Sequence, residues 1–205
     1  METAQFVDPD VSRAKFDREI EEFRALEGTY LRRGWLLVRA AFPCAVVVLA
    51  APQLHPPAIV TGVAFDYTNY DAQPPSVQLV HPFTLQPYRA KELPTNLRQR
   101  SPSPQAANFP FPGIPEGASI QFLAEQPLMQ SHSPEEVPFL CLAGVREYHE
   151  HPAHTGDAWE LHRAIGAGRM VRLLEIIYKY GVQPITTYGV QLIPQINFQQ
   201  GQAPE

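Results

Sequence analysis

Apolar residues recur at helical spacing near the start of the chain, with charged residues on the other faces. The apolar positions are Phe16, Ile20, Phe23 and Leu26. Their intervals of four and three residues predict an amphipathic helix over about residues 10–27. Asp8 or Asp10 can cap its N-terminus, and Gly28 stands where a C-terminal stop belongs.

Four β-rich runs follow this helix, each bounded by proline, glycine or Asn/Asp turn signals. They are Tyr30 to Phe42, Ala45 to Ala51, Ile59 to Tyr67 and Val77 to Val80. Because the connections between them are short, we expect an antiparallel meander of four strands. A helix followed by a meander indicates a fold of the α+β class.

The pattern is lost over residues 86–138. The chain has 22 prolines, and half of them lie between Pro82 and Pro138. Proline prevents helix formation and weakens strand pairing, so we interpret the segment as a long Pro-rich insertion without regular structure. Within it, only Ser119 to Ala124 could pair as a strand.

Helical spacing returns after Cys141. Asp157 can cap a helix that enters at Trp159, and Gly166 and Gly168 are expected to break it. The helix after the break has an apolar face made of Met170, Leu173, Leu174, Ile177 and Tyr178. The C-terminal part is therefore predicted to be helical.

The length of 205 residues, 44% of them apolar, suits one domain with one core. We expect a flexible N-terminus over residues 1–9 and a single domain over 10–181, with its insertion at about 86–138. Residues 182–205 would be a partly disordered extension, in which Gly189 to Ile193 is a possible strand.

Composition excludes several classes of partner. The formal net charge is −5 and no basic cluster is present, so no nucleic acid is expected. The longest apolar run, Ala40 to Pro52, contains Pro43 and falls short of the roughly 20 residues of a membrane span. Only two cysteines are present and no secretory signal is visible, so we expect a reduced, cytoplasmic protein.

Candidate chemistry is concentrated after Cys141, within 21 residues that hold four of the seven histidines. The residues are His149, His151, His154 and His162, with Glu147, Glu150 and Asp157 among them. A thiol with a pKa of about 8.5 is mostly protonated at neutral pH, so a nearby imidazole is the usual means of activating it. A thiolate and imidazoles are also good zinc ligands.

Both interpretations stay open on these residues. Cys141, Glu147, His149 and His151 could close a tetrahedral zinc site, although Cys141 has no nearby cysteine partner and the spacing matches no defined zinc finger. Alternatively, the segment is a solvated histidine-rich loop around a structural cysteine. Cys44 lies among apolar residues and is expected to be part of the core.

The order of elements resembles that of the ubiquitin-conjugating enzyme superfamily over residues 10–181. That family has an N-terminal helix, a four-stranded meander, a proline pair before the fourth strand, a His-Pro motif after it, a thioester cysteine, a tryptophan and a second helix. The corresponding residues here are Pro74-Pro75, Val77 to Val80, His81-Pro82, Cys141 and Trp159.

Two features depart from the family pattern. Phe83 stands where the family has an asparagine that stabilises the oxyanion or organises the active-site loop, and 58 residues separate Pro82 from Cys141. Bacterial conjugating-enzyme-like proteins tolerate both departures and often use a histidine elsewhere. The segment from Cys141 to His162 is also similar to a bacterial family predicted to bind metal through Cys, Glu and two His residues.

The resemblance implies a ubiquitin-conjugating-enzyme-like fold and a function. Cys141 would accept a ubiquitin-like protein as a thioester from an activating enzyme and pass it to an amine of a protein substrate. No cofactor would be needed, whereas the alternative interpretation requires zinc. The residues expected to assist Cys141 are His149, His151 or His154, and those expected to meet the activating enzyme are Arg13, Arg18 and Arg24.

Overall fold

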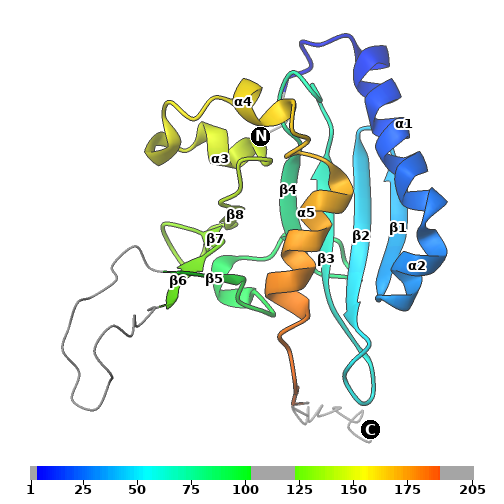
Figure 1. Cartoon of the computed structure of the whole chain (residues 1–205), viewed down its shortest axis with the longest axis vertical. Coiled ribbons are helices and arrows are strands. Elements are labelled where there is room, and N and C mark those ends of the chain that lie inside the picture. Colours follow the sequence, from blue (N-terminus) through cyan, green and yellow to red (C-terminus); the bar gives the residue numbers. More distant parts are fainter. Residues whose placement is uncertain (1–3, 103–122, 190–205) are drawn as a thin grey trace, which may run out of the picture.

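A four-stranded antiparallel sheet in the order β1-β2-β3-β4 organises the chain (Figure 1). The computed structural model describes residues 4–102 and 123–189. The strands are β1 (Trp35–Ala41), β2 (Cys44–Ala51), β3 (Ala58–Asp66) and β4 (Ser76–Val80). The predicted meander and the α+β class are therefore confirmed.

One row of apolar partners crosses the whole sheet. Leu37 pairs with Val47, which pairs with Val63, which pairs with Leu79. Successive side chains of a strand point to opposite faces, so this row defines the face that is packed against the helices. Val47, Val63 and Leu79 are buried there, and they form part of the hydrophobic core.

The predicted N-terminal helix is α1 (Pro9–Ala25), and Asp8 caps it by accepting a hydrogen bond from the backbone N–H of Asp10. Phe16, Ile20 and Phe23 of its apolar face are buried against the sheet, whereas Leu26, the last position of the predicted apolar stripe, lies after the helix and is exposed. Gly28 does not end the helix as predicted. The chain breaks at Leu26 instead, and Gly28 lies within a second short helix, α2 (Glu27–Arg32).

The start of the first strand was also predicted wrongly, because Tyr30 belongs to α2. Gly34 sets the boundary between helix and strand, with a φ of +83° that favours glycine. A Cβ at this position would lie 2.6 Å from the carbonyl oxygen of Ala50 on the neighbouring strand. The strand can therefore begin only at Trp35, after this close approach.

The Pro-rich segment contains short elements where it is described, so the interpretation as a loop was wrong for its flanks. They are η1 (Ala90–Glu92), β5 (Arg98–Pro102), β6 (Leu123–Pro127), β7 (Met129–Gln130) and β8 (Phe139–Leu140). β5 pairs with β6 and β7 with β8, in two antiparallel ribbons beside the main sheet (Figure 1). Buried Leu97 and Leu128 pack them onto the core. Of the possible strand at 119–124, residues 119–122 lie outside the described residues.

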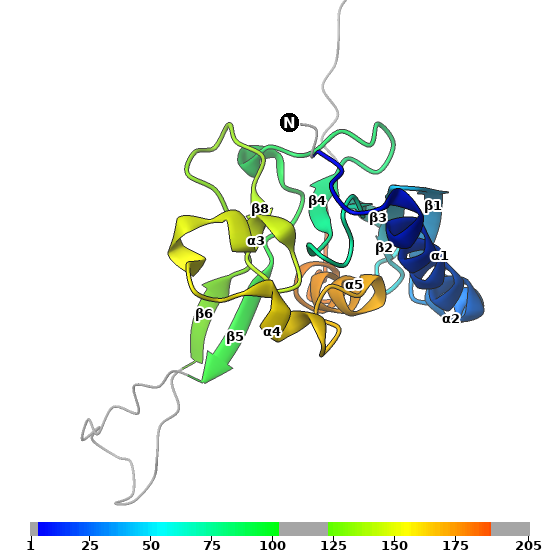
Figure 2. The ribbon, with the colours of Figure 1, turned by 90° about the horizontal axis from the view of Figure 1, so that it is seen from above.

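The C-terminal helices are α3 (Arg146–Glu150), η2 (Pro152–His154), α4 (Trp159–Arg163), α5 (Met170–Ile177) and the π-helical turn η3 (Tyr178–Val182). As predicted, the chain breaks around Gly166 and Gly168, and the apolar face of α5 is buried. Figures 1 and 2 show α5 on the same face of the sheet as α1. No helix among the described residues is long and apolar enough to cross a membrane.

Asn69 holds the described part of the N-terminus. Its buried side-chain Oδ1 accepts hydrogen bonds from the backbone N–H groups of Phe6 and Val7, and its Nδ2 donates to the carbonyl of Ala4. Residues 4–7 of the segment predicted to be flexible are thus bound to the domain. Gly189, the first residue of the possible last strand, is not in a strand, and residues 190–193 lie outside the described residues.

Candidate functional site

Cys141 lies directly after β8, where its backbone N–H donates a 2.7 Å hydrogen bond to the carbonyl of Leu128. Its side chain is partly buried, and this burial raises the pKa of the thiol. The Sγ atom lies 3.4 Å from Nε2 of His154, which is carried by η2. The structure therefore pairs a predominantly protonated thiol with an imidazole that can accept its proton.

His154 is held in place by an aromatic stack. Its ring lies 3.8 Å from the ring of Tyr148, centroid to centroid, at an angle of 21°. The Tyr148 hydroxyl donates a 2.6 Å hydrogen bond to Oδ2 of Asp157. This bond raises the pKa of Tyr148 to about 12 and lowers that of Asp157, so the pair remains a phenol and a carboxylate at neutral pH.

Asp157 joins three segments of this region, although it was predicted only to cap the following helix. Its other carboxylate oxygen lies 2.6 Å from Nε2 of His162 on α4, and its backbone carbonyl lies 2.8 Å from Nδ1 of His149 on α3. The helix α4 starts at Trp159 without a side-chain cap. The prediction of a cap was therefore wrong, because the carboxylate binds Tyr148 and His162 instead.

The other two candidate histidines have partners of their own. Both ring nitrogens of His149 lie 2.8 Å from backbone carbonyl oxygens, those of Asp157 and Ala143. The ring of His151 stacks on Phe139, and its Nδ1 accepts a hydrogen bond from a backbone N–H group. Of the three predicted helpers, the structure thus brings His154 alone into a hydrogen-bonding contact with Cys141.

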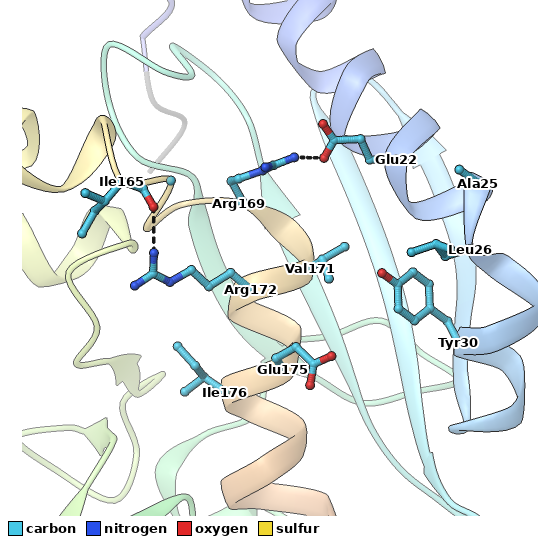
Figure 3. A pocket seen from close by; sticks show the side chains of 11 residues that line it. Glu22, Ala25, Leu26, Tyr30, Ile165, Arg169, Val171, Arg172, Glu175 and Ile176 are labelled. Atoms are coloured by element: carbon cyan, nitrogen blue, oxygen red, sulfur yellow. Dashed lines mark hydrogen bonds and ion pairs between the residues drawn. The ribbon is translucent and has the colours of Figure 1, made fainter.

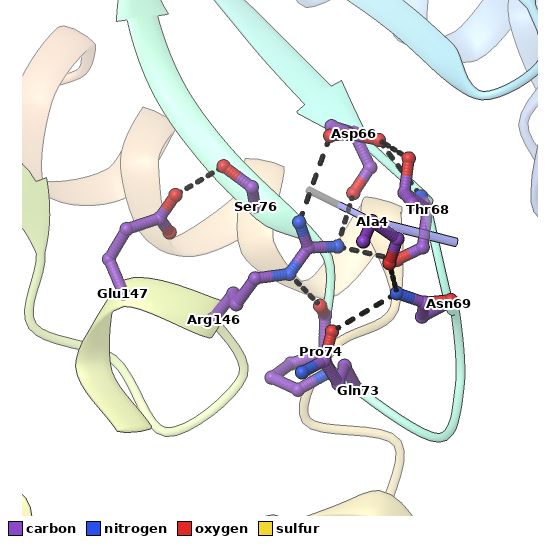
Figure 4. A network of polar contacts seen from close by, with 9 residues as sticks. All are labelled: Ala4, Asp66, Thr68, Asn69, Gln73, Pro74, Ser76, Arg146 and Glu147. Atoms are coloured by element: carbon purple, nitrogen blue, oxygen red, sulfur yellow. Dashed lines mark hydrogen bonds and ion pairs between the residues drawn. The ribbon is translucent and has the colours of Figure 1, made fainter. Parts of the chain in front are cut away.

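Glu147, the predicted acidic zinc ligand, faces the main sheet. Its Oε1 accepts a hydrogen bond from the hydroxyl of Ser76 on β4, while Oε2 is buried without a partner (Figure 4). Burial raises the pKa of this carboxyl group. The predicted set of Cys141, Glu147, His149 and His151 is not gathered around one point. Within residues 4–102 and 123–189, no three His, Cys, Asp or Glu side chains are arranged to hold a metal ion.

The residues that carried the family resemblance have contacts of their own. Trp159 is buried, and its Nε1 donates a 2.8 Å hydrogen bond to the carbonyl of Asp71. His81 forms a turn after β4, where its Nδ1 accepts hydrogen bonds from the backbone N–H groups of Phe83 and Thr84. Phe83 itself is exposed and supplies no polar side chain.

Sequence reasoning missed Arg146, which is only 4% exposed. Its guanidinium donates to the carbonyls of Thr68 (2.6 Å) and Pro74 (3.3 Å), and it lies 3.7 Å from the carboxylate of Asp66 (Figure 4). Its backbone N–H donates to the carbonyl of Pro75. An arginine in a short polar helix normally indicates a solvated face, and no sequence signal distinguishes this one.

The fold and the site define an α+β protein that pairs a partly buried thiol with an imidazole beside a four-stranded antiparallel sheet. A sequence model of the Y4jH family, described as Y4jH-like, matches residues 7–185, and the chain belongs to this family. It is 43% identical over 192 residues to a protein named "Uncharacterized protein y4jH" from Sinorhizobium fredii (strain NBRC 101917 / NGR234). The match covers 94% of this chain and 92% of that protein.

Replacing Arg146 by methionine tests the hydrogen bonds that its buried guanidinium donates to the loop between β3 and β4. Methionine keeps much of the apolar volume but leaves the carbonyls of Thr68 and Pro74 without their donor, whereas Asp66 is 37% exposed and can be hydrated. We expect the free energy of unfolding to fall by about 1–3 kcal/mol in urea titrations. The same substitution at exposed Arg39 is the control and should change it by less than about 0.5 kcal/mol. Equal stability of the two variants would contradict a stabilising role for the hydrogen bonds of Arg146.

Replacing Glu147 by glutamine tests its burial. Burial raises the pKa of the Glu147 carboxyl group above its ordinary value of 4.5 in the folded state. The stability that this group contributes is therefore complete below its unfolded pKa and is lost as the pH rises through its folded pKa. We expect the free energy of unfolding of Glu147→Gln to rise relative to that of the wild type as the pH increases from about 4 to about 8, measured by urea unfolding. Glu150→Gln, on the exposed side of α3, is the matched control. A constant difference between wild type and Glu147→Gln across this range would contradict the assignment.

Proposed function

We propose that the protein is a conjugating enzyme that carries a ubiquitin-like protein as a thioester on Cys141. It would receive the modifier from an activating enzyme and transfer it to an amine of a protein substrate. The observation that carries this proposal is the 3.4 Å contact between Sγ of Cys141 and Nε2 of His154.

The arrangement of the chain supports the same proposal. The elements follow one another in the order that led to the resemblance with conjugating enzymes. That order is α1, the meander β1 to β4, Cys141, buried Trp159 and α5. The exposed arginines Arg13, Arg18 and Arg24 on α1 are the proposed contact with the activating enzyme. We also propose that the protein has the ubiquitin-conjugating-enzyme-like fold and that it acts in a bacterial, cytoplasmic system.

The chemistry is acyl transfer in two steps. His154 takes the thiol proton, and the sulfur of Cys141 attacks the thioester carbonyl carbon, so that a new C–S bond forms and the activating enzyme's thiol leaves. An amine then attacks the thioester on Cys141, an amide bond forms, and the cysteine thiolate leaves and is reprotonated. Because burial raises the pKa of Cys141, the imidazole is needed to populate the thiolate. A positioned general base of this kind contributes about 10²–10⁴-fold to the rate.

His154 takes the assisting role because His149 uses both ring nitrogens on backbone carbonyls. Tyr148 and Asp157 orient it through the ring stack and the hydroxyl hydrogen bond. We assign them as positioning residues, since Tyr148 and Asp157 hydrogen-bond to each other and not to the thiol, which contacts His154. The asparagine of the conjugating-enzyme motif has no polar counterpart at exposed Phe83, so the oxyanion donor must come from elsewhere.

A charging assay tests the proposal. Purified protein is incubated with ATP, an activating enzyme and a ubiquitin-like protein from the same genome, and is resolved with and without thiol reductant. We expect a reductant-sensitive adduct that is lost in Cys141→Ala, kept in Cys44→Ala, and formed more slowly in His154→Gln.

Two results would contradict the thioester mechanism. One is the absence of an adduct while the activating enzyme itself becomes charged. The other is stoichiometric zinc in the purified protein, measured by elemental analysis and lost in Cys141→Ala. The second result would establish the alternative function, in which Cys141 is a zinc ligand.

A further inference from the structure

An open groove of about 920 Å³ runs between α1–α2 and α5, on the helical face of the domain (Figure 3). Its walls are mainly apolar, with Ala25, Leu26 and Tyr30 on one side and Val171 and Ile176 on the other. A second, polar cavity of about 380 Å³ continues it toward the N-terminal part of α1, and both share Glu22, Ile165, Gly166 and Arg169. We call the two together the arginine groove.

Large apolar side chains at both lips of the arginine groove face solvent. Leu26, at the junction of α1 and α2, is 53% exposed, and Ile165, on the turn before α5, is 63% exposed. Exposed apolar residues around a concave surface mark a site of interaction more often than scattered ones do. None of the lining residues belongs to the Cys141 site.

Each carboxylate that lines the arginine groove lies within ion-pair distance of a cationic side chain. Glu22 and Glu19 share Arg169, and the bridge from Arg169 to Glu22 crosses the groove (Figure 3). Asp71 pairs with Lys15, and Glu175 pairs with Arg33. Because Glu19 and Glu22 share a single arginine, one negative charge is left over at that pair, whereas Asp71 and Glu175 each have a cation of their own.

Three lining arginines, in contrast, have no carboxylate within ion-pair distance among the described residues: Arg18, Arg163 and Arg172. The guanidinium of Arg172 is held at the mouth by a 2.8 Å hydrogen bond to the carbonyl of Ile165, which leaves its charge uncompensated. These three arginines outnumber the one carboxylate charge left over at Glu19 and Glu22, so on a chain with a net charge of −5 the groove holds an excess of positive charge beside apolar walls. Its complement is an apolar ligand with acidic groups.

The length of the groove favours a polypeptide. Its wall on α1 and α2 extends from Arg18 to Tyr30, and at 1.5 Å per residue this span measures about 18 Å. Two helices flanking an open apolar trough provide the geometry into which an amphipathic helix lays its apolar face. A peptide of this length would reach the unpaired arginines at both ends.

We propose that the arginine groove binds an acidic amphipathic helix of a partner protein. Apolar residues of that helix would pack between Leu26, Tyr30 and Ile176, and its Asp or Glu side chains would pair with Arg163 and Arg172. The proposal is independent of thioester chemistry, because Cys141 and His154 take no part in it.

Peptide selection tests the proposal. A phage library of random peptides of about 12 residues is selected on the intact protein, and the recovered peptides are synthesised and titrated by fluorescence anisotropy. We expect peptides with apolar residues at helical spacing and at least two acidic residues. Arg172→Glu and Leu26→Asp should each weaken their binding by about tenfold or more.

Two matched controls and a charge swap complete the experiment. Arg32→Glu and Leu31→Asp alter exposed residues of α2 that do not line the groove, and they should leave the affinity unchanged. Replacing one acidic residue of the peptide by lysine should restore binding to Arg172→Glu. Cys141→Ala should bind as the wild type does, so this outcome is separate from that of the charging assay.

The proposal would be overturned by any of three results. The selection yields no binding peptides, or it enriches basic or purely apolar ones, or the acidic peptides bind Arg172→Glu as tightly as the wild type. If Arg172→Glu lowers the melting temperature, Arg163→Glu in the polar cavity replaces it in the titration.

Discussion

The buried guanidinium of Arg146 is the constraint on which the site depends. It satisfies carbonyl groups of the loop between β3 and β4, and its own helix carries Glu147, Tyr148 and His149. A charged group removed from water is tolerated only with full hydrogen bonding, so the loop and the helix must keep one relative position. Close packing adds a second constraint nearby, since a Cβ at Gly144 would lie 2.1 Å from the carbonyl oxygen of Ala167.

This fixed helix supports a chain of contacts that ends at the thiol. Asp157 binds the Tyr148 hydroxyl, the Tyr148 ring stacks on His154, and His154 reaches Cys141. The residues come from β8, α3, η2 and the loop before α4, so the pairing of thiol and imidazole is a property of the tertiary structure. The arginine groove lies between α1 and α5, and none of its lining residues belongs to this chain of contacts.

The sequence predicted those elements whose periodicity is long and regular, such as α1, the meander and the apolar face of α5. It predicted candidate chemistry after Cys141, but it could not tell which of three histidines lies against the thiol, because ring stacking and carbonyl contacts depend on the folded loop. Gly28 and Tyr30 were misassigned since the helix boundary is set by the contact of Gly34 with Ala50 across the sheet. Strand β5 was missed, and β6 was predicted only at its first residues, Leu123 and Ala124, because backbone pairing overrides the proline content of this ribbon.

The central claim is that His154 activates Cys141, and the most direct measurement is the rate at which iodoacetamide alkylates Cys141 as a function of pH. Both proteins in the measurement carry Cys44→Ala, so that Cys141 is the one thiol left to react. One of them keeps His154, and the other carries His154→Gln. The account predicts that the glutamine variant reacts several-fold more slowly near neutral pH and that the two rates converge at high pH, where the thiol ionises unaided. Coinciding profiles over the whole range would contradict it, since the imidazole would then have no effect on the thiolate.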